Sequence, residues 1–336
     1  MTTGATRARS GTARKGPAQT RGGLDLGGTK IEAIVVDRRN QVLGSARRQT
    51  PTAGGPPEVA AELVHAMTDA CAEVGIEPSA LDGVGVGSPG SVDPQTGAVA
   101  NARNLPGWEA SFPLAETLSA KLGTPVRVGN DVQVATDAEF RLGAAKPYRS
   151  ILGVFWGTGV GGGLILRGKP WLGRGAAGEI GHTVIRAGGR HCPCGRRGCV
   201  EAYAGRGAME ARARKLAGRG THTNLFHLME ERGRTRLTSA IWARAIERGD
   251  KLATELIEEA IEALGIGIAS AINLLDLEAV IVGGGLGVRF GAPTVERIAQ
   301  AMMPHLFNVN RPPAVHVAGL GDVGGAVGAA LLTTKS

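Results

Sequence analysis

The sequence has little of what membrane-bound and secreted proteins require. No stretch approaches twenty consecutive apolar residues without charges or glycine-rich breaks, so no membrane-spanning helix is predicted. The first 21 residues contain no apolar run, which excludes a secretory signal. Only four cysteines are present, three of them clustered, which fits a reducing compartment better than a disulfide framework. We therefore expect a cytoplasmic protein without a membrane partner.

Aromatic residues are also scarce, at 4% of the chain, and no basic surface interleaved with aromatics is evident. The formal net charge is +8, but residues 1–21 contribute five positive charges before any acidic residue, which leaves +3 for the remainder (8 − 5). The composition of residues 1–21 predicts a disordered basic tail. No nucleic-acid partner is predicted.

Glycine, in contrast, is abundant: its 53 residues are concentrated in turns that follow apolar runs. With 336 residues, 43% of them hydrophobic and 20% charged, the chain can form two domains with separate cores. Residues 22–49 predict strands joined by tight turns, and residues 150–171 predict a similar hairpin, so a duplicated α/β unit is expected. Further strands are predicted at 82–89, 125–131, 277–285 and 314–320, and helices at 56–75, 114–122, 132–145, across 203–273, near 293–306 and at the C-terminus.

The stretch from His182 to Glu201 holds the densest chemistry. Cys192, Cys194 and Cys199 can supply three sulfurs to a tetrahedral zinc ion from one short loop. His182 and His191 compete for the fourth position, and His182 is favoured because a residue adjacent to Cys192 has little freedom to reach the same ion. The alternative is a set of free or disulfide-bonded thiols. Since four protein ligands leave no open position, the zinc is expected to be structural.

Polar residues at both ends of this loop, Glu179, His182 and Glu201, could face a polyol. A histidine that binds zinc through one ring nitrogen can still donate an N–H from the other. Metal and ligand could therefore share His182.

Three glycine turns follow strands and could contact phosphate: Gly27-Gly28-Thr29, Gly157-Thr158-Gly159 and Gly283-Gly284-Gly285. Glycine lets backbone N–H groups approach anionic oxygens, and the threonines add hydroxyl donors. None is a Walker P-loop or a GxGxxG fingerprint, and each could be an ordinary hairpin turn. Asp25, beside the first turn, could reach a hydrated Mg²⁺ ion or could cap the turn.

Taken together, eight motifs resemble the ROK family of sugar kinases and related repressors, in order DLGGTK, GSPGSVD, NLPGW, VGND, GTGVGGG, GEIGH, CPCGRRGCVE and IVGGG. The resemblance covers residues 22–332. It implies an actin-like, sugar-kinase ATPase (ribonuclease H-like) fold with two α/β domains around a central cleft. The expected domains are 22–132, completed by a C-terminal helix at 322–336, and 133–321, which contains the zinc loop 182–201.

The resemblance also implies roles for individual residues. Asp131 would be the catalytic base and would touch the sugar. Sugar hydroxyls would be bound by Asn104, Asn130, Glu179, His182 and Glu201, and zinc by His182, Cys192, Cys194 and Cys199. The three glycine turns, with Asp25 and Lys30, would bind ATP and Mg²⁺. The chain departs from the family pattern at Val132-Gln133-Val134, where members often have an Ala/Asn-rich helix. For Asn130 and Asp131 the alternative role is helix capping.

The expected activity is ATP-dependent phosphorylation of the 6-hydroxyl of glucose. The nearest alternative is a kinase of N-acetylmannosamine or N-acetylglucosamine. The space around C2 of the bound sugar, formed by the loop residues around Pro89, Gly90 and Gly107, would distinguish these sugars from glucose. A polyphosphate-dependent glucokinase is a further variant. A sugar-responsive repressor is disfavoured because only about 21 residues precede the first strand, too few for a helix-turn-helix. The family resemblance implies a homodimer or a tetramer.

Overall fold

The first lobe is built on a five-stranded mixed sheet. The computed structural model describes residues 19–102 and 104–334, and here the strand order is β3-β2-β1-β4-β7. β1 pairs antiparallel with β2 and parallel with β4. The strands are β1 (Arg21–Leu26), β2 (Lys30–Val36), β3 (Val42–Gln49), β4 (Val84–Ser88) and β7 (Val126–Asn130), with a short ribbon of β5 (Ser91–Val92) and β6 (Val99–Ala100).

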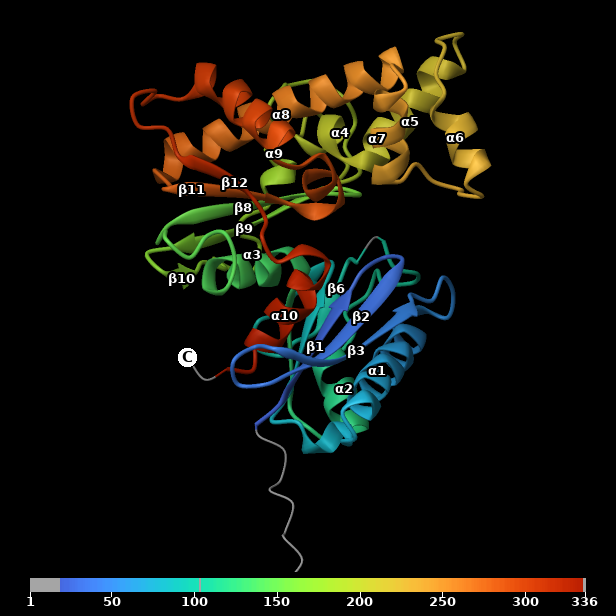
Figure 1. Cartoon of the computed structure of the whole chain (residues 1–336), viewed down its shortest axis with the longest axis vertical. Coiled ribbons are helices and arrows are strands. Elements are labelled where there is room, and N and C mark those ends of the chain that lie inside the picture. Colours follow the sequence, from blue (N-terminus) through green and yellow to red (C-terminus); the bar gives the residue numbers. More distant parts are fainter. Residues whose placement is uncertain (1–18, 103, 335–336) are drawn as a thin grey trace, which may run out of the picture.

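The second lobe repeats this arrangement in the order β10-β9-β8-β11-β12. β8 pairs antiparallel with β9 and parallel with β11, as β1 does with its neighbours. The strands are β8 (Ile151–Trp156), β9 (Val160–Leu166), β10 (Lys169–Pro170), β11 (Ala279–Gly283) and β12 (Ala314–Val317). Figure 1 shows the two sheets one above the other. The duplicated α/β unit predicted from the two hairpins is therefore confirmed.

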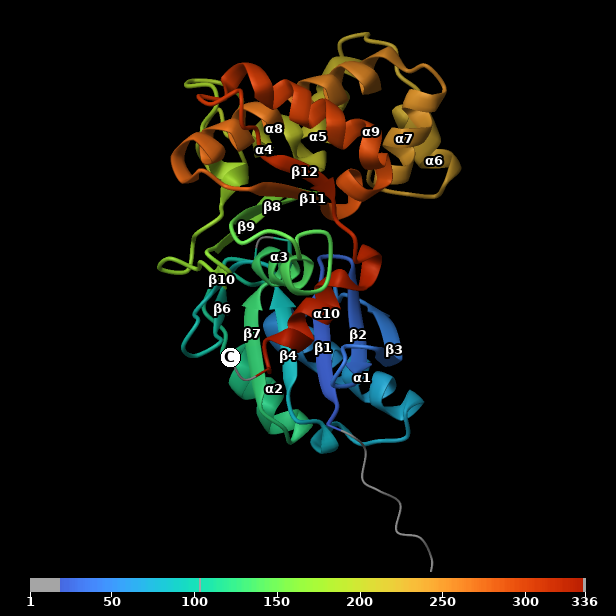
Figure 2. The same cartoon turned by 60° about the vertical axis from the view of Figure 1, so that its left-hand side comes forward.

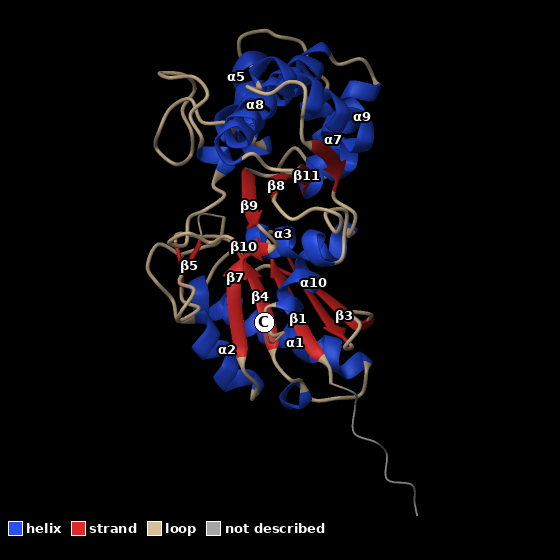
Figure 3. Cartoon of the chain, turned by 90° about the vertical axis from the view of Figure 1, so that its left-hand side faces the viewer, coloured by secondary structure: helices blue, strands red, loops and turns tan. Residues whose placement is uncertain are grey.

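Helices cover the faces of both sheets. In the part of the chain that the structure describes they are α1 (Gly55–Glu73), α2 (Leu114–Leu122), α3 (Asp131–Arg141), α4 (Glu201–Ala204), α5 (Arg206–Ala217), α6 (Leu225–Glu231), α7 (Ser239–Glu247), α8 (Lys251–Leu275), α9 (Gly284–Met302) and α10 (Gly324–Leu331). α1 and α2 pack on the first sheet, and α9 packs on the second. α3 contacts strands of both sheets and lies between them (Figure 3).

The sequence pattern explains these elements. α1 begins with two prolines at its N-terminus, where a missing N–H costs nothing, and buries the apolar residues that recur at helical spacing, such as Val59, Leu63 and Met67. Asn130 caps α3 by accepting hydrogen bonds from the N–H groups of Val132 and Gln133. Asn130 therefore has the helix-capping role that was considered for it as the alternative.

α10 belongs spatially to the first lobe, although it comes last in the chain (Figure 2). It lies directly on β1 and β4 because glycines remove the side chains between them. A Cβ on Gly23 would overlap the carbonyl oxygen of Ala326, and a Cβ on Gly85 would overlap that of Ala329. This close approach places the first turn of α10 beside the end of β1.

We expect Gly85→Ala to destabilise the protein by about 1–3 kcal/mol, because the added methyl group overlaps backbone that cannot move without displacing α10. Gly207→Ala is the matched control: it lies in α5, and its nearest neighbour would be 3.6 Å away. Urea unfolding curves measure both. Equal midpoints for Gly85→Ala and the wild type would contradict the close packing of α10.

A buried carboxylate holds together the two chain segments that join the lobes. Glu139, in α3, accepts hydrogen bonds from the backbone N–H of Ala144 at 2.9 Å, on the segment leading to β8. It also accepts from Gly319 at 3.0 Å and Leu320 at 2.8 Å, on the segment leading from β12 to α10. One side chain therefore links both connections.

The structure differs from the sequence predictions at several boundaries. Arg21 was assigned to the tail but begins β1, and its guanidinium donates to the Asp37 carbonyl and to Asn40. Thr20 was also assigned to the tail, but it is buried and its carbonyl accepts a hydrogen bond from the Asp82 N–H. Residues 1–18 of the predicted tail lie outside the described residues. The predicted domain boundary at 132/133 falls inside α3. α10 spans Gly324–Leu331 rather than 322–336, and residues 335–336 are not described.

The helix expected near 293–306 is present as the second part of α9, after a kink at Gly291 where φ is 64°. A first part of α9, beginning at Gly284, was not predicted. No helix among the described residues is long and apolar enough to cross a membrane.

Candidate active site

Three carboxylates from the two lobes come together around Asp131. Asp131 is the first residue of α3, directly after β7, and its Oδ1 accepts a hydrogen bond from the Val132 N–H at 2.9 Å. Burial, and then the negative charge of Asp25, raise the pKa of its carboxyl to about 7, and Glu179 adds to the rise. A carboxylate with a pKa near neutrality can take a proton at physiological pH.

Asp25, near the end of β1, is the second of these carboxylates. Burial raises its pKa to about 6, against the attraction of Lys30 and with a further contribution from Glu32. Its carboxylate lies 2.7 Å from the position that a Cβ would take on Gly325, in the first turn of α10. Two neighbouring carboxylates with raised pKa values fit a divalent cation, because Mg²⁺ prefers oxygen ligands and relieves their repulsion.

The first glycine turn, between β1 and β2, is held by hydrogen bonds from Thr50, which directly follows β3. The Gly27 N–H donates to the Lys30 carbonyl. The Thr50 hydroxyl donates to the Gly27 carbonyl, and the Thr50 backbone N–H donates to the Thr29 carbonyl. Asn104 packs against Gly28, with its Nδ2 3.1 Å from the position of a Cβ there. Sequence reasoning missed Thr50, whose only signal is its place after β3, opposite the turn.

Lys30, expected at the phosphates, forms an ion pair with Glu32 at 3.3 Å in the structure. Its ammonium group is partly exposed, so it can still reach an anion at the first turn.

The second and third glycine turns meet in the other lobe. A Cβ on Gly157 would lie 3.8 Å from the backbone nitrogen of Gly285. Gly284 has φ of 78° and lies against the backbone of Trp156, so this position requires glycine. Two of the three predicted turns therefore form one surface of backbone groups.

Arg206, at the start of α5, lies at this surface and was missed by sequence reasoning. Its guanidinium donates to the Thr158 hydroxyl at 2.8 Å and to the Ser239 hydroxyl at 3.3 Å. No sequence motif includes Arg206, and its partner Ser239 is more than thirty residues away in the chain.

Glu201 lies between the cysteine loop and the second glycine turn. Its carboxylate accepts a hydrogen bond from the Val160 N–H at 2.9 Å and packs against Gly159. The segment containing Glu179 and His182 packs on β9 as well, since a Cβ on Gly181 would overlap the Val160 carbonyl. Glu179 itself is exposed.

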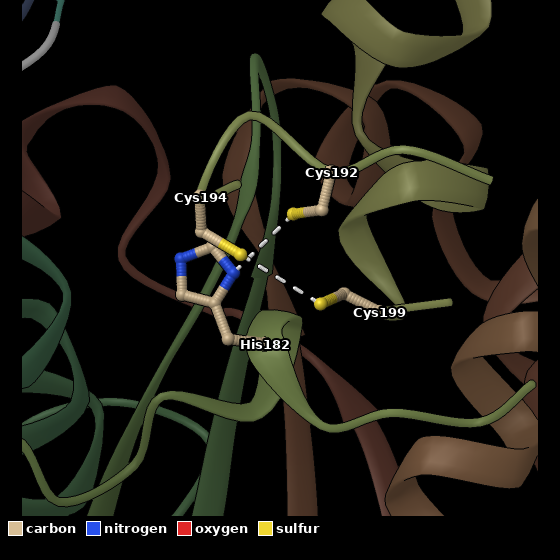
Figure 4. Close-up of side chains that lie close together, drawn as sticks. All are labelled: His182, Cys192, Cys194 and Cys199. Carbon is tan, nitrogen blue, oxygen red and sulfur yellow. Dashed lines mark hydrogen bonds between the residues drawn. The ribbon is translucent and has the colours of Figure 1, made fainter. Parts of the chain in front are cut away.

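The four predicted metal ligands converge (Figure 4). The ligand atoms of His182, Cys192, Cys194 and Cys199 all lie within 4.8 Å of one another. The Cys194 and Cys199 sulfurs are 3.8 Å apart, and the Cys192 sulfur is 3.7 Å from His182 Nδ1. Zinc bonded tetrahedrally at about 2.3 Å to sulfur and about 2.0 Å to nitrogen requires a sulfur–sulfur separation of about 3.8 Å and a sulfur–nitrogen separation of about 3.5 Å, so the set fits zinc.

The histidine geometry also separates the two candidates for the fourth ligand. The other ring nitrogen of His182 points away from the sulfurs (Figure 4). His191 instead forms a hydrogen bond with Arg197 at 2.6 Å. The structure thus brings His182 to the cluster and leaves His191 outside it.

The cysteine loop is fixed to the body of the second lobe. Arg190 forms an ion pair with Glu259 of α8 at 2.7 Å and lies 4.8 Å from the centre of the Tyr203 ring. Cys192 and Cys199 are buried beside Tyr203 and Ala263. The cluster therefore rests on a rigid element rather than on a loop alone.

The loop expected near sugar C2 lies partly beside Asn130. Gly90 has φ of 90°, and its carbonyl accepts a hydrogen bond from Asn130 Nδ2 at 3.3 Å. Gly107 lies against Gly55 at the start of α1. Gly90 therefore lies beside Asn130, one of the predicted sugar ligands.

Comparison with known proteins covers nearly the whole chain. The ROK family profile matches residues 21–336. The chain is 33% identical to a glucokinase of Streptomyces coelicolor, over 93% of this chain and 97% of the relative, and 31% identical to an N-acetyl-D-glucosamine kinase of Salmonella heidelberg, over 92% and 98%.

Two solved structures share the fold. A ROK hexokinase from Thermus thermophilus is 34% identical, with a TM-score of 0.74, and covers 93% of this chain and 97% of its own. A ROK family glucokinase from Streptomyces griseus, in complex with glucose and AMPPNP, is 31% identical, with a TM-score of 0.79 and coverage of 93% and 98%. The predicted actin-like, sugar-kinase ATPase fold is confirmed.

Proposed function

Because the chain belongs to the ROK family, as its motifs indicated, we propose that it is an ATP-dependent sugar kinase that phosphorylates the 6-hydroxyl of glucose. The observation that carries the proposal is the buried carboxyl of Asp131 at the start of α3, whose pKa is near neutrality under the negative charges of Asp25 and Glu179. A relative in the same family was solved with glucose and an ATP analogue, which supports both substrates.

In the proposed reaction Asp131 takes the proton of the sugar hydroxyl while that oxygen attacks the γ-phosphorus of ATP. The bond from phosphorus to the β,γ-bridging oxygen breaks, and ADP leaves. Bound Mg²⁺ supplies positive charge on the phosphates, and Asp25 would hold it through water. The N–H groups of the glycine turns at 27–29, 157–159 and 283–285 would bind the phosphate oxygens.

The sugar would be held by side chains from both lobes. Asn104 and Asn130 come from the first lobe, and Glu179, His182 and Glu201 from the second. We propose that zinc occupies the His182 cluster through Nδ1, so that Nε2 donates its N–H to a sugar hydroxyl. The metal would thus orient a sugar-binding group without joining the reaction.

N-acetylglucosamine is the second candidate substrate. Relatives named as kinases of this sugar are about as similar to the chain as the glucokinases are. The two sugars differ only at C2, so the segment that contains Gly90 would decide between them. We favour glucose because a relative that was solved with glucose bound matches the chain with a TM-score of 0.79.

A coupled assay of ADP release with Mg²⁺ and ATP tests the proposal across glucose, mannose, fructose, N-acetylglucosamine and N-acetylmannosamine. We expect the highest kcat/KM with glucose. A preference for an acetylated sugar would move the assignment to the second candidate. Turnover with polyphosphate but not ATP would overturn the donor assignment, and no turnover with any sugar by folded, zinc-loaded protein would overturn the kinase assignment.

We also propose that the protein acts in the cytoplasm as a homodimer or a tetramer. Light scattering of the purified full chain measures the assembly directly, and a monomer at working concentrations would contradict this proposal.

A further inference from the structure

We propose that Arg206 binds the phosphate chain of the donor and orients the Thr158 hydroxyl toward the same phosphates. This inference rests on the proposed function and assigns a further residue to it. Arg206 is the first residue of α5 and lies outside the motifs that carried the sequence assignment.

The backbone fixes Arg206 at the second glycine turn. Its own N–H donates to the Gly157 carbonyl at 3.1 Å, and the next N–H, of Gly207, donates to the Thr158 carbonyl at 3.0 Å. The start of α5 and the turn therefore move as one unit. Whatever the turn binds, Arg206 lies beside it.

Within the described part of the chain, the positive charge of the Arg206 guanidinium is offset only by the nearby charge of Glu210, without an ion pair. Among the described residues no carboxylate forms an ion pair with it, and its hydrogen bonds go only to the hydroxyls of Thr158 and Ser239. The nearest compensating acid, Glu210, is already bonded to Arg214, Arg236 and the Leu237 N–H. A partly buried guanidinium without a carboxylate favours an anionic ligand.

The electrostatic environment leads to the same conclusion. Burial lowers the pKa of Arg206, and the positive charge of Arg236 lowers it further, with only Glu210 opposing. An arginine nevertheless stays protonated, so the repulsion remains until an anion binds. Arg236 is itself paired with Glu210 at 3.3 Å, so Arg206 is the guanidinium left to bind an anion at the glycine turn.

Thr158 connects this charge to the turn. Its Oγ accepts a hydrogen bond from Arg206, which leaves the hydroxyl proton available to donate elsewhere. Thr158 is exposed, and the adjacent Gly157 lies against Gly285 of the third turn. The hydroxyl and the guanidinium can therefore donate together to oxygens held between these two turns.

The alternative is that Arg206 has only a structural role, as a strut that connects the turn to Ser239 at the start of α7 by hydrogen bonds. Loss of a strut would lower stability and weaken every ligand equally. Loss of a phosphate contact would weaken phosphate-bearing ligands alone. Adenosine and tripolyphosphate, which are the two parts of the donor, separate these outcomes.

The experiment first establishes that wild-type full-length protein transfers phosphate from ATP to a sugar, and then compares Arg206→Gln, Arg206→Lys and Lys215→Gln by calorimetry. Lys215→Gln removes the same charge from α5, away from the turn. We expect Arg206→Gln to bind AMPPNP and tripolyphosphate roughly 10- to 100-fold more weakly, as for lost hydrogen bonds to charged groups, with adenosine and glucose unaffected. Arg206→Lys should recover part of the loss, and Lys215→Gln should match the wild type.

Unchanged affinity of Arg206→Gln for AMPPNP, or an equal loss for adenosine, would overturn the proposal. A double-mutant cycle with Thr158→Val tests the orientation of the hydroxyl: we expect coupling between the two positions, and strictly additive effects would remove that part. If the wild type binds AMPPNP through Arg206 but transfers phosphate to no sugar, the proposed function fails while this inference stands.

Discussion

Asp131→Asn is expected to lower kcat for sugar phosphorylation by about 10²- to 10⁴-fold, the range for loss of a general base, while glucose binding survives. Asparagine keeps the shape and can still accept the Val132 hydrogen bond, but it cannot take a proton. Asp137→Asn is the matched control, since Asp137 lies in the same helix and pairs with Arg141. Stopped assays of ADP release and calorimetry with glucose measure the two effects.

The pH dependence of the wild type provides an independent check on Asp131. Its carboxyl must be ionised to act, so kcat/KM should fall about tenfold per pH unit below its pKa of about 7. The effect on stability has the opposite sign. Because the folded-state pKa is raised above the unfolded value, the ionised group disfavours the native state. Stability should therefore fall as pH rises from about 4 to about 7 and then level off, since both states are ionised above pH 7. Asp131→Asn should therefore melt at a higher temperature than the wild type at pH 8. Near-normal turnover in this variant would remove the assignment of the base.

Cys199→Ala is expected to abolish zinc binding and to lower kcat/KM for the sugar by about 10- to 100-fold, the cost of disturbing the shell of a metal site. Cys199 is fully buried, lies 3.8 Å from the Cys194 sulfur, and is two residues from Glu201, so loss of the metal should loosen a proposed sugar ligand. Metal analysis by mass spectrometry should find one zinc per wild-type chain and none in the variant.

Cys71→Ala is the matched control for this prediction, because Cys71 is buried in α1 outside the cluster. It should retain its zinc and its activity. Chelation of the wild type should reproduce the loss, and Zn²⁺ rather than Mg²⁺ should restore it. A Cys199→Ala protein that keeps both metal and activity would show that the thiols serve another purpose.

Sequence alone could predict the candidate site where its residues are close along the chain. The four proposed metal ligands lie within eighteen residues, and their spacing alone indicated a closed tetrahedral site. Asp131 was recognisable because it follows a short apolar strand and starts a helix. Local order along the chain suffices for such residues.

Residues whose role depends on tertiary contacts could not be found in this way. Thr50 acts on a turn more than twenty residues earlier, and Arg206 meets Ser239 only after α5 and α7 have packed. The raised pKa of Asp131 depends on Asp25 and on burial, neither of which is a property of its own segment. The part of α9 before the kink at Gly291 was missed because Gly284 and Gly285 are poor helix formers, a preference that tertiary packing overrides.

The placement of α10 has a consequence for biosynthesis. The second sheet and its helices come from one continuous stretch of chain, but β1 and β4 remain uncovered on one face until α10, more than two hundred residues further on, has been made. Domains generally fold as units during synthesis, from the N-terminus onward. In this chain the order is reversed: the lobe that emerges first from the ribosome is the last to be completed, and a nascent chain lacking α10 presents a bare glycine-lined sheet face to chaperones.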